Sequence, residues 1–393
     1  MTRETSKPTT NEGSLCEFRK SFETVRKASY MIGIDTSTPE RDTNIRIIGS
    51  NLFLMALYVV CLYSGWFLRA DWYSLLELSV CLLLTLQGSS KMWTAIVHKV
   101  RYFELFQTTE RIYERFDSDE RNRPILIDVI AKMNLLIKGI VIVYVSSGLL
   151  IVVVVVLYAS ITRQKFLALT AFIPFVDYTT SAGYILHSML HLSMIVICVD
   201  GYLAADVAFI ITVVPIIAYG NCLQNEIRHL NLLLQTPQRN EKLITENLVR
   251  ICQLHQMIVE FEQDAVEHFK FGCAVQILFQ SGTLLVTIFL TYICGYLQAA
   301  CIFMALFFQL TQYCALGTIV TAKKNNQMII DIYDIEWYLL DKPQQRIVSF
   351  MLFRAQTAKD LSVGGVAPLN VVTYVKIMKA IYSYLAMLMT FVE

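Results

Sequence analysis

Long apolar stretches separated by charged connections dominate the hydrophobic pattern of this chain. A helix that crosses a bilayer needs about 20 mostly apolar residues. Seven windows of this kind occur, at residues 45–68, 74–97, 135–160, 184–220, 271–295, 299–321 and 369–391. We therefore predict an all-α membrane protein with seven transmembrane helices.

The fourth window, residues 184–220, is long for a single crossing and contains Asp200 and Asp206. A division at Gly201 would give two helices that are each too short to cross a bilayer. We therefore predict one tilted helix that projects from the membrane.

The positions of Lys and Arg predict the orientation, because positive charge gathers in cytoplasmic connections. The N-terminal tail and the connections 98–134, 221–270 and 321–368 hold 25 of these residues, against three in the alternate loops. The N-terminus is therefore expected in the cytoplasm and the C-terminus outside. G-protein-coupled receptors have the reverse orientation, so charge argues against that class.

The same pattern divides the chain into six segments. They are a cytoplasmic tail (1–44), transmembrane helices one to four (45–220), a cytoplasmic helical extension (221–270), transmembrane helices five and six (271–321), a cytoplasmic anchor helix and turn (322–368), and the last transmembrane helix (369–393).

Two cytoplasmic segments carry apolar residues at helical spacing, which is typical of one buried helix face. One runs from Ile251 to Phe269 and the other from Met328 to Leu340. We expect them to pack together as an inner anchor subdomain, or against the same helices of neighbouring subunits.

The tail contains a third amphipathic pattern in Phe18, Phe22, Val25 and Tyr30. It predicts a short helix on the inner membrane surface, ended by Pro39.

The external loop 161–183 includes the apolar run from Phe172 to Phe175 and is expected to fold over the bundle as a lid. His187 and His191 follow at i, i+4, the nearest approach to metal-ligand spacing. Without a third ligand, we expect them to face a cavity or a partner helix, with no metal. Cys294 and Cys301 flank an outer turn and could form a disulfide, but free thiols are the expectation.

Composition narrows the function further. Hydrophobic residues make up 55% of the chain and charged residues 17%. The net charge of +1 gives no reason to expect a nucleic-acid partner. No nucleophile elbow, phosphate loop or HExxH motif occurs in the sequence, so we expect neither an enzyme nor a cofactor. Glu77, Asp200 and Asp206 in or near spans keep a secondary transporter open as an alternative.

The last helix has an unusual polar pattern. Lys376 and Lys379 lie two to three turns into it, where a lipid-facing lysine costs about 2.5–3.5 kcal/mol. They either snorkel to the headgroups or line a water-filled vestibule. Ser383, Met387 and Phe391 follow at i, i+4, i+8. This line suits a pore with a hydrophobic gate, and equally suits helix packing.

Four motifs stand out in the C-terminal third. They are Asp331-Ile-Tyr333-Asp-Ile-Glu336-Trp337-Tyr338, Met351-Leu-Phe-Arg354-Ala-Gln356, Gly364-Gly-Val-Ala-Pro-Leu-Asn370 and Tyr382-Ser-Tyr384. Together they resemble the C-terminal signature of insect odorant receptors. The related gustatory receptors end in a Thr-Tyr followed by a Gln-Phe pair, which this chain lacks, so the resemblance is to the odorant branch.

Members of that family are odorant-gated, non-selective cation channels that form tetramers around a pore lined by the last helix. A tuning subunit joins a co-receptor subunit whose second cytoplasmic insertion is longer than residues 221–270 here. The resemblance therefore implies a tuning subunit that binds a small volatile odorant, lies among the lipids of the plasma membrane of olfactory sensory dendrites, and assembles with the co-receptor. A transporter or a non-conducting seven-helix chemoreceptor of the gustatory type is the alternative.

The resemblance also implies positions for the functional residues. Met387 and Phe391 match the apolar gate, with Ser383 one turn below and Lys376 and Lys379 along the inner vestibule. By depth in the membrane, the odorant pocket would comprise Leu83, Ser147, Gly148, Ile151, Val152, His191, Met194, Tyr292 and Phe303.

Overall fold

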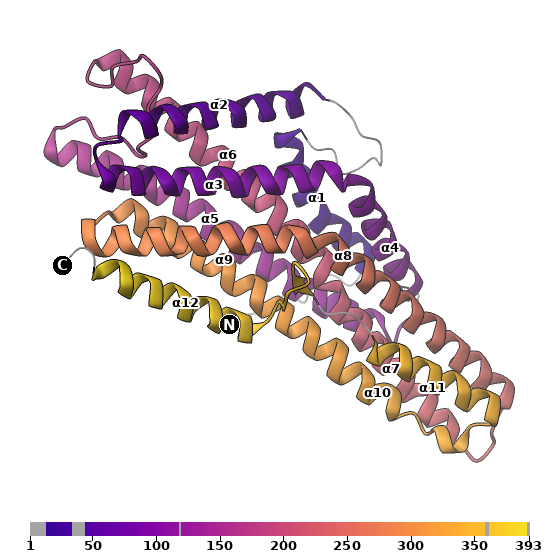
Figure 1. Cartoon of the computed structure of the whole chain (residues 1–393). Helices are drawn as coiled ribbons and strands as arrows, with labels where there is room; N and C mark the ends of the chain where they lie inside the picture. The colour runs from indigo at the N-terminus through magenta and orange to yellow at the C-terminus, as the bar shows by residue number, and fades with distance from the viewer. Residues whose placement is uncertain (1–12, 34–43, 118, 358–360, 391–393) are drawn as a thin grey trace, which may run out of the picture.

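The computed structural model describes residues 13–33, 44–117, 119–357 and 361–390, and it is mostly helical (Figure 1). Seven helical segments within these ranges are long and apolar enough to cross a membrane, as predicted. They are α2 (Ile45–Phe67), α3 (Trp72–Val97), α5 (Arg123–Thr162), α6 (Ser181–Val213) continued by α7 (Pro215–Gln235), α8 (Glu241–Cys294), α9 (Leu297–Thr321) and α12 (Val371–Met389).

The remaining elements lie around one end of this bundle. They are α1 (Ser14–Ile32), α4 (Lys99–Asp117), a π-helical turn (Ala322–Met328), α10 (Ile329–Tyr333), a 3₁₀ turn (Trp337–Leu339), α11 (Lys342–Gln356) and the strands β1 (Ser362–Val363) and β2 (Ala367–Pro368).

The fourth span passes through Gly201 without interruption, as predicted, and α6 ends only at Val213. Pro215 occupies the first turn of α7, where its missing N–H and fixed φ are tolerated. The helical path therefore continues beyond the bundle to Gln235. Two other helices are longer than their predicted spans. α5 begins at Arg123, and α8 joins the predicted cytoplasmic helix and the fifth span into 54 continuous residues.

An inner subdomain projects from the bundle and is formed by α7, the first part of α8, α10 and α11 (Figure 1). The apolar stripe of α8 is buried from Ile251 to Ala265. The predicted helix from Met328 to Leu340 is wrong in its second half, because α10 ends at Tyr333. Asn231 of α7 explains the end: its side chain donates to the Asp334 carbonyl at 2.9 Å and accepts from the Glu336 N–H at 3.1 Å. These bonds replace those that a continuing helix would make.

The N-terminal helix α1 packs on protein, which corrects the prediction of a helix on the membrane surface. Phe18 stacks on Tyr113 of α4 with ring centroids 4.8 Å apart, and Phe22 stacks on Phe106. Phe18, Phe22 and Val25 are buried, so α4, α5 and α6 cover the face that the pattern assigned to lipid. The helix ends at Gly33, whose φ of 96° suits glycine. Pro39 lies outside the described residues.

The loop after α5 folds back onto the C-terminal end of α2 and the N-terminal end of α6, as predicted for a lid. The Phe172 N–H donates to Ser64 Oγ at 2.7 Å, and the Ile173 N–H donates to His187 Nε2 at 2.9 Å. His191 Nε2 bonds the carbonyl of Ala171 at 2.8 Å. Phe175, however, points away and is 96% exposed.

The two histidines therefore hold loop backbone. Among the described residues no cluster of His, Cys, Asp or Glu could hold a metal ion. All ten cysteines, including Cys294 and Cys301, are free thiols.

A short hairpin connects the inner subdomain to α12. Strands β1 and β2 are joined through Gly364 and Gly365, with φ values of 64° and 78°, a conformation that glycine adopts without steric cost. Gly317 of α9 permits the next step, because a Cβ there would lie 2.0 Å from the Leu369 carbonyl oxygen. Asn370 then caps α12 by accepting from the Thr373 N–H at 3.0 Å, as asparagine commonly does at a helix start. These contacts place the start of α12 directly against α9.

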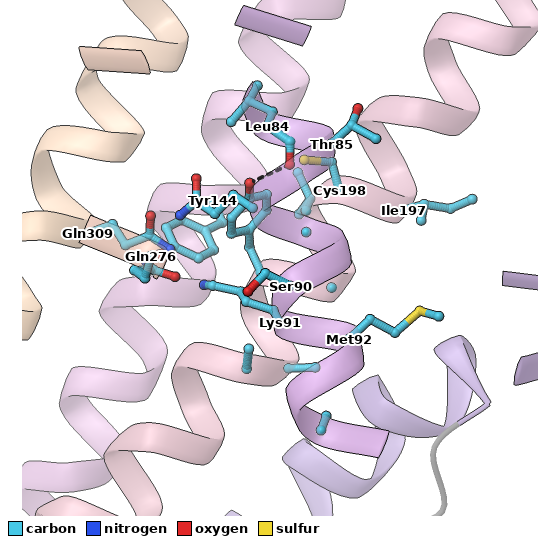
Figure 2. Close-up of a pocket in the computed structure, with 18 of the residues that line it drawn as sticks. Leu84, Thr85, Ser90, Lys91, Met92, Tyr144, Ile197, Cys198, Gln276 and Gln309 are labelled. Carbon is cyan, nitrogen blue, oxygen red and sulfur yellow. Dashed lines mark hydrogen bonds between the residues drawn. The ribbon is translucent and has the colours of Figure 1, made fainter. Parts of the chain in front are cut away.

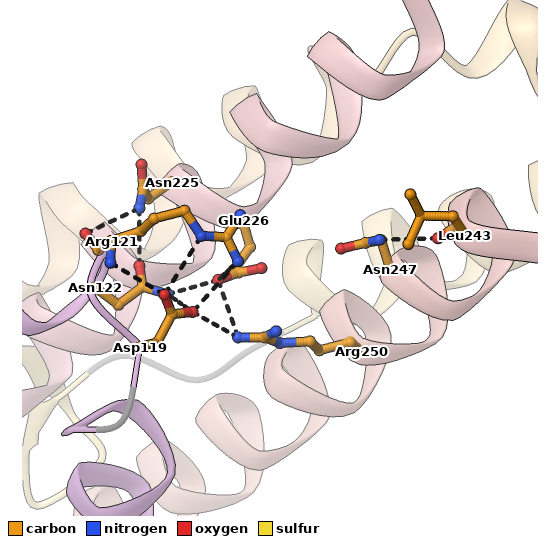
Figure 3. Close-up of polar contacts among 8 residues, drawn as sticks. All are labelled: Asp119, Arg121, Asn122, Asn225, Glu226, Leu243, Asn247 and Arg250. Carbon is orange, nitrogen blue, oxygen red and sulfur yellow. Dashed lines mark hydrogen bonds and ion pairs between the residues drawn. The ribbon is translucent and has the colours of Figure 1, made fainter. Parts of the chain in front are cut away.

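A polar cluster ties the α4–α5 connection to the inner subdomain (Figure 3). Glu226 of α7 is buried and accepts from Asn122 Nδ2 at 2.5 Å and from Arg250 of α8 at 3.3 Å. Arg250 also bonds Asp119 at 2.8 Å. Partial burial works to raise the pKa of Asp119, but hydrogen bonds from the Arg121 backbone and from the Arg121 and Arg250 side chains outweigh it and hold the pKa below its usual value.

We expect Glu226→Ala to lower the stability of the protein by about 1–3 kcal/mol. The loss stays below that of a fully buried pair because Arg250 remains partly exposed. The thermal unfolding midpoint of the detergent-solubilised protein measures it. The control is Asp128→Ala, which breaks the exposed Asp128–Lys132 pair. This control should cost less than about 0.5 kcal/mol. Equal midpoints for the two variants would show that the cluster does not hold the subdomain.

Candidate functional site

A cavity of about 300 Å³ opens inside the bundle and is lined mainly by apolar side chains from α2, α3, α5, α6, α8 and α9 (Figure 2). Small-molecule sites are commonly cavities of this kind, with a few polar groups in an apolar wall. Four of the predicted pocket residues, Ser147, Gly148, Ile151 and Met194, line it. Leu169 of the lid loop also contributes to the wall.

The other five predicted pocket residues lie elsewhere. Leu83 faces Gly282 of α8, while its neighbour Leu84 lines the cavity. Tyr292 is 70% exposed. The remaining three, none of which lines the cavity, are Val152, Phe303, which stacks on Phe307, and His191, which holds the lid.

One side of the cavity is polar, because a single carboxylate there accepts hydrogen bonds from side chains of three neighbouring helices. Asp206 of α6 is fully buried and accepts from Lys91 Nζ of α3 at 2.5 Å. It also accepts from Tyr313 OH at 2.8 Å and Gln309 Nε2 at 2.5 Å, both on α9. Tyr144 of α5 donates to the same carboxylate. All four donors line the cavity.

These hydrogen bonds determine whether the acidic residues of the spans remain free to bind another group. A carboxylate offers about four lone-pair sites, and the four donors to Asp206 occupy them. Asp206 is therefore a structural acceptor that joins α3, α5, α6 and α9. Glu77 accepts a hydrogen bond from Tyr296 near the N-terminal end of α3, and Asp200 is half-buried.

The last helix, α12, contacts α8 and α9 through one face, on which Thr373 and Ile381 are buried. The predicted pore residues Lys376, Lys379, Ser383 and Met387 are exposed on the rest of the helix. The predicted gate residue Phe391 lies outside the described residues.

Comparison with known proteins identifies the family. The sequence model described as the 7tm odorant receptor family matches residues 74–382, which is most of the chain. The chain belongs to the odorant receptor family. The resemblance found in the C-terminal motifs is thereby confirmed, and the protein is a multi-pass membrane chemoreceptor and not an enzyme.

Relatives and solved structures of odorant receptors match this chain over nearly its whole length. "Putative odorant receptor 83c" from Drosophila melanogaster is 21% identical, and the match covers 97% of this chain and 99% of that protein. The structure of the insect olfactory receptor OR5 from Machilis hrabei in complex with eugenol matches with a TM-score of 0.74 at 12% identity, over 95% of this chain and 97% of that one. The OR5 structure described without eugenol matches with a TM-score of 0.72 at 14% identity, over 95% of this chain and 99% of that one. At these identities the structural likeness shows the fold.

Sequence reasoning missed the polar side of this odorant receptor cavity. Lys91 lies near the end of its span, where a lysine is ordinarily interpreted as a charge at the membrane boundary. The signal that could have found it is Asp206, because an acidic residue inside a membrane span needs a partner. Gln309 and Tyr313 both bond that acid, and their i, i+4 spacing places them on one face of α9.

We expect Asp206→Asn to leave the Lys91 ammonium unpaired and to cost about 3–5 kcal/mol. Most of the variant should then misfold. Adding Lys91→Met removes the stranded charge and should recover much of the folded protein. The yield of monodisperse protein in size-exclusion chromatography measures both effects, and equal yields for the single and double variants would contradict the pairing.

Proposed function

We propose that this protein is the odorant-binding tuning subunit of a cation channel that it forms with a co-receptor subunit. The carrying observation is the apolar cavity inside a chain of the odorant receptor family. Buried apolar area and a few polar groups are what a small volatile needs for binding. The related OR5 structure is a complex with eugenol, a small volatile of this kind.

The exposed surface supports assembly with further subunits. α12 leaves Val372, Tyr382 and Met387 exposed, although the helix is apolar enough to cross a membrane. The inner subdomain exposes large side chains at Tyr333, Trp337, Tyr338, Phe350 and Phe353. Exposed apolar patches on a folded protein mark interaction sites. Neighbouring subunits would cover both, so that the α12 helices surround a central pore.

In this arrangement the N-terminus lies in the cytoplasm and the inner subdomain extends from the inner membrane face. Lys376 and Lys379 then line a hydrated vestibule, while Ser383, Met387 and Phe391 follow toward the outer mouth. Met387 and Phe391 close the pore by dewetting. Odorant binding among the outer helices moves α12 and opens this gate. The plasma membrane of olfactory sensory dendrites is the site of action.

Filling the cavity should reduce odorant sensitivity. Ala205 lines the cavity, and Ala205→Phe places a ring in the space that the odorant needs. Overpacking costs about 1–3 kcal/mol, so the odorant concentration for half-maximal current should rise by about tenfold or more. Whole-cell recording with the co-receptor co-expressed measures this. Ala182→Phe, on the exposed first turn of α6, is the matched control.

Two results would overturn this function. Unchanged odorant sensitivity in Ala205→Phe would place the odorant outside the cavity. Saturable uptake of a solute, or a second-messenger response without current, would favour the transporter or the non-conducting receptor.

Met387→Ser should increase the resting conductance, because a polar side chain at the constriction favours wetting of the closed pore. We expect a larger leak current without odorant and a smaller fractional increase with it. Met189→Ser is the matched control, since Met189 is also exposed but lies on α6, away from the proposed pore. Unaltered leak and evoked currents in Met387→Ser would show that Met387 is not part of the gate.

A further inference from the structure

Three glutamines of the cavity wall, Gln87, Gln276 and Gln309, carry amide oxygens that have no hydrogen-bond partner among the described residues. Gln276 on α8 and Gln309 on α9 are 3% and 1% exposed, and both line the cavity. Buried polar atoms are normally paired, and an unpaired one in a wall calls for a ligand or a water molecule. Gln87 on α3 has neither amide atom bonded, so either atom can serve a bound group. Gln276 and Gln309 have bonded nitrogens, so their two free oxygens indicate what kind of group the cavity is built to accept.

The surrounding hydrogen bonds fix which end of each amide is the oxygen. Gln309 Nε2 donates to the Asp206 carboxylate at 2.5 Å, and a carboxylate only accepts. Gln280 Nε2 donates to the Leu306 carbonyl at 2.7 Å, so the other end of Gln280 must be the acceptor for Gln276 Nε2 at 3.4 Å. The unpaired ends of Gln276 and Gln309 are therefore both oxygens, which require a donor.

A donor lies on the same side of the cavity. Figure 2 shows Lys91, Tyr144, Gln276 and Gln309 grouped together, from α3, α5, α8 and α9. A lysine ammonium has three N–H groups. The described hydrogen bonds use one of them, on Asp206, and the ammonium also lies 4.5 Å from the Tyr202 ring centroid. The paired charges of Lys91 and Asp206 leave this corner without net charge. It offers an N–H donor beside two amide acceptors.

Resting on the function proposed above, we propose that this corner recognises a hydroxyl group and that the ligands of the receptor are alcohols or phenols. A hydroxyl can donate to Gln276 Oε1 and at the same time accept from Lys91. Ketones, esters and ethers only accept, so they leave the glutamine oxygens unpaired in an apolar cavity. Hydrocarbons do neither, and a protonated amine only donates, so it offers no acceptor to Lys91. The apolar remainder of the wall holds the carbon skeleton.

The test compares ligands that differ only in the donor. The probes are 1-phenylethanol against acetophenone, and 2-octanol against 2-octanone, which match in their non-hydrogen atoms. The readouts are whole-cell current with the co-receptor and thermal stabilisation of the purified full-length chain by each probe. Each alcohol should act at about tenfold lower concentration than its ketone, or lower still, because a site that hydrogen-bonds a hydroxyl rejects analogues lacking it.

Gln276→Met keeps the length of the side chain and removes the acceptor. It should weaken the alcohols about tenfold and leave the ketones unchanged, so most of the preference disappears. Gln312→Met is the matched control: Gln312 is another buried glutamine with unpartnered amide atoms, on α9, but it does not line the cavity. This variant should keep the preference.

Each outcome decides the proposal. Equal action of alcohols and ketones, a preference that persists in Gln276→Met, or failure of every alcohol to stabilise the protein would overturn it. A persistent preference would indicate that bound water satisfies the glutamines. Selective stabilisation by alcohols without any current would support hydroxyl recognition and overturn the proposed channel function instead.

Discussion

The Asp206 carboxylate imposes the main constraint on this bundle. An ion in an apolar, membrane-embedded interior is costly unless every lone pair is satisfied. Here the donors come from α3, α5 and α9, while the acid itself belongs to α6. The rotation of each helix is therefore fixed about one point, more strictly than interchangeable apolar contacts could do. The cavity lies beside this point, because all four donors are part of its wall.

A second set of contacts links the inner subdomain to α12. The hairpin bonds α8 through the Gly364 N–H and the Lys270 carbonyl, at 3.1 Å. The chain then crosses α9 at Gly317, and Thr318 Oγ1 accepts from the Val371 N–H at 2.8 Å. The structure therefore explains three residues of the C-terminal motif. Gly364 and Gly365 have positive φ values, and Asn370 caps the last helix. Residues of this motif thus attach the last helix to α8 and α9.

The sequence predicted the number of spans well, because the hydropathy of a window of about 20 residues is insensitive to rotation. The cavity residues depend on rotation, and adjacent helical positions differ by about 100°. Depth in the membrane therefore does not distinguish Leu83 from Leu84, or Val152 from Ile151. In each pair the second residue lines the cavity and the first does not. The α1 prediction failed for another reason. An amphipathic face shows that something apolar covers it, but it does not distinguish lipid from protein.

The unbroken helix α8 has a mechanical consequence. It contains 54 residues, and a rise of about 1.5 Å per residue gives it a length of about 80 Å. It runs from the end of the bundle at Cys294, past the cavity wall at Gln276, to the far tip of the inner subdomain (Figure 1). A long rigid helix converts a small change of tilt at one end into a large displacement at the other. If one end is held, a rotation of about 5° displaces the other by roughly 7 Å over this length. Small adjustments around a bound molecule would thus be amplified at the tip of the inner subdomain, where the exposed aromatic side chains lie.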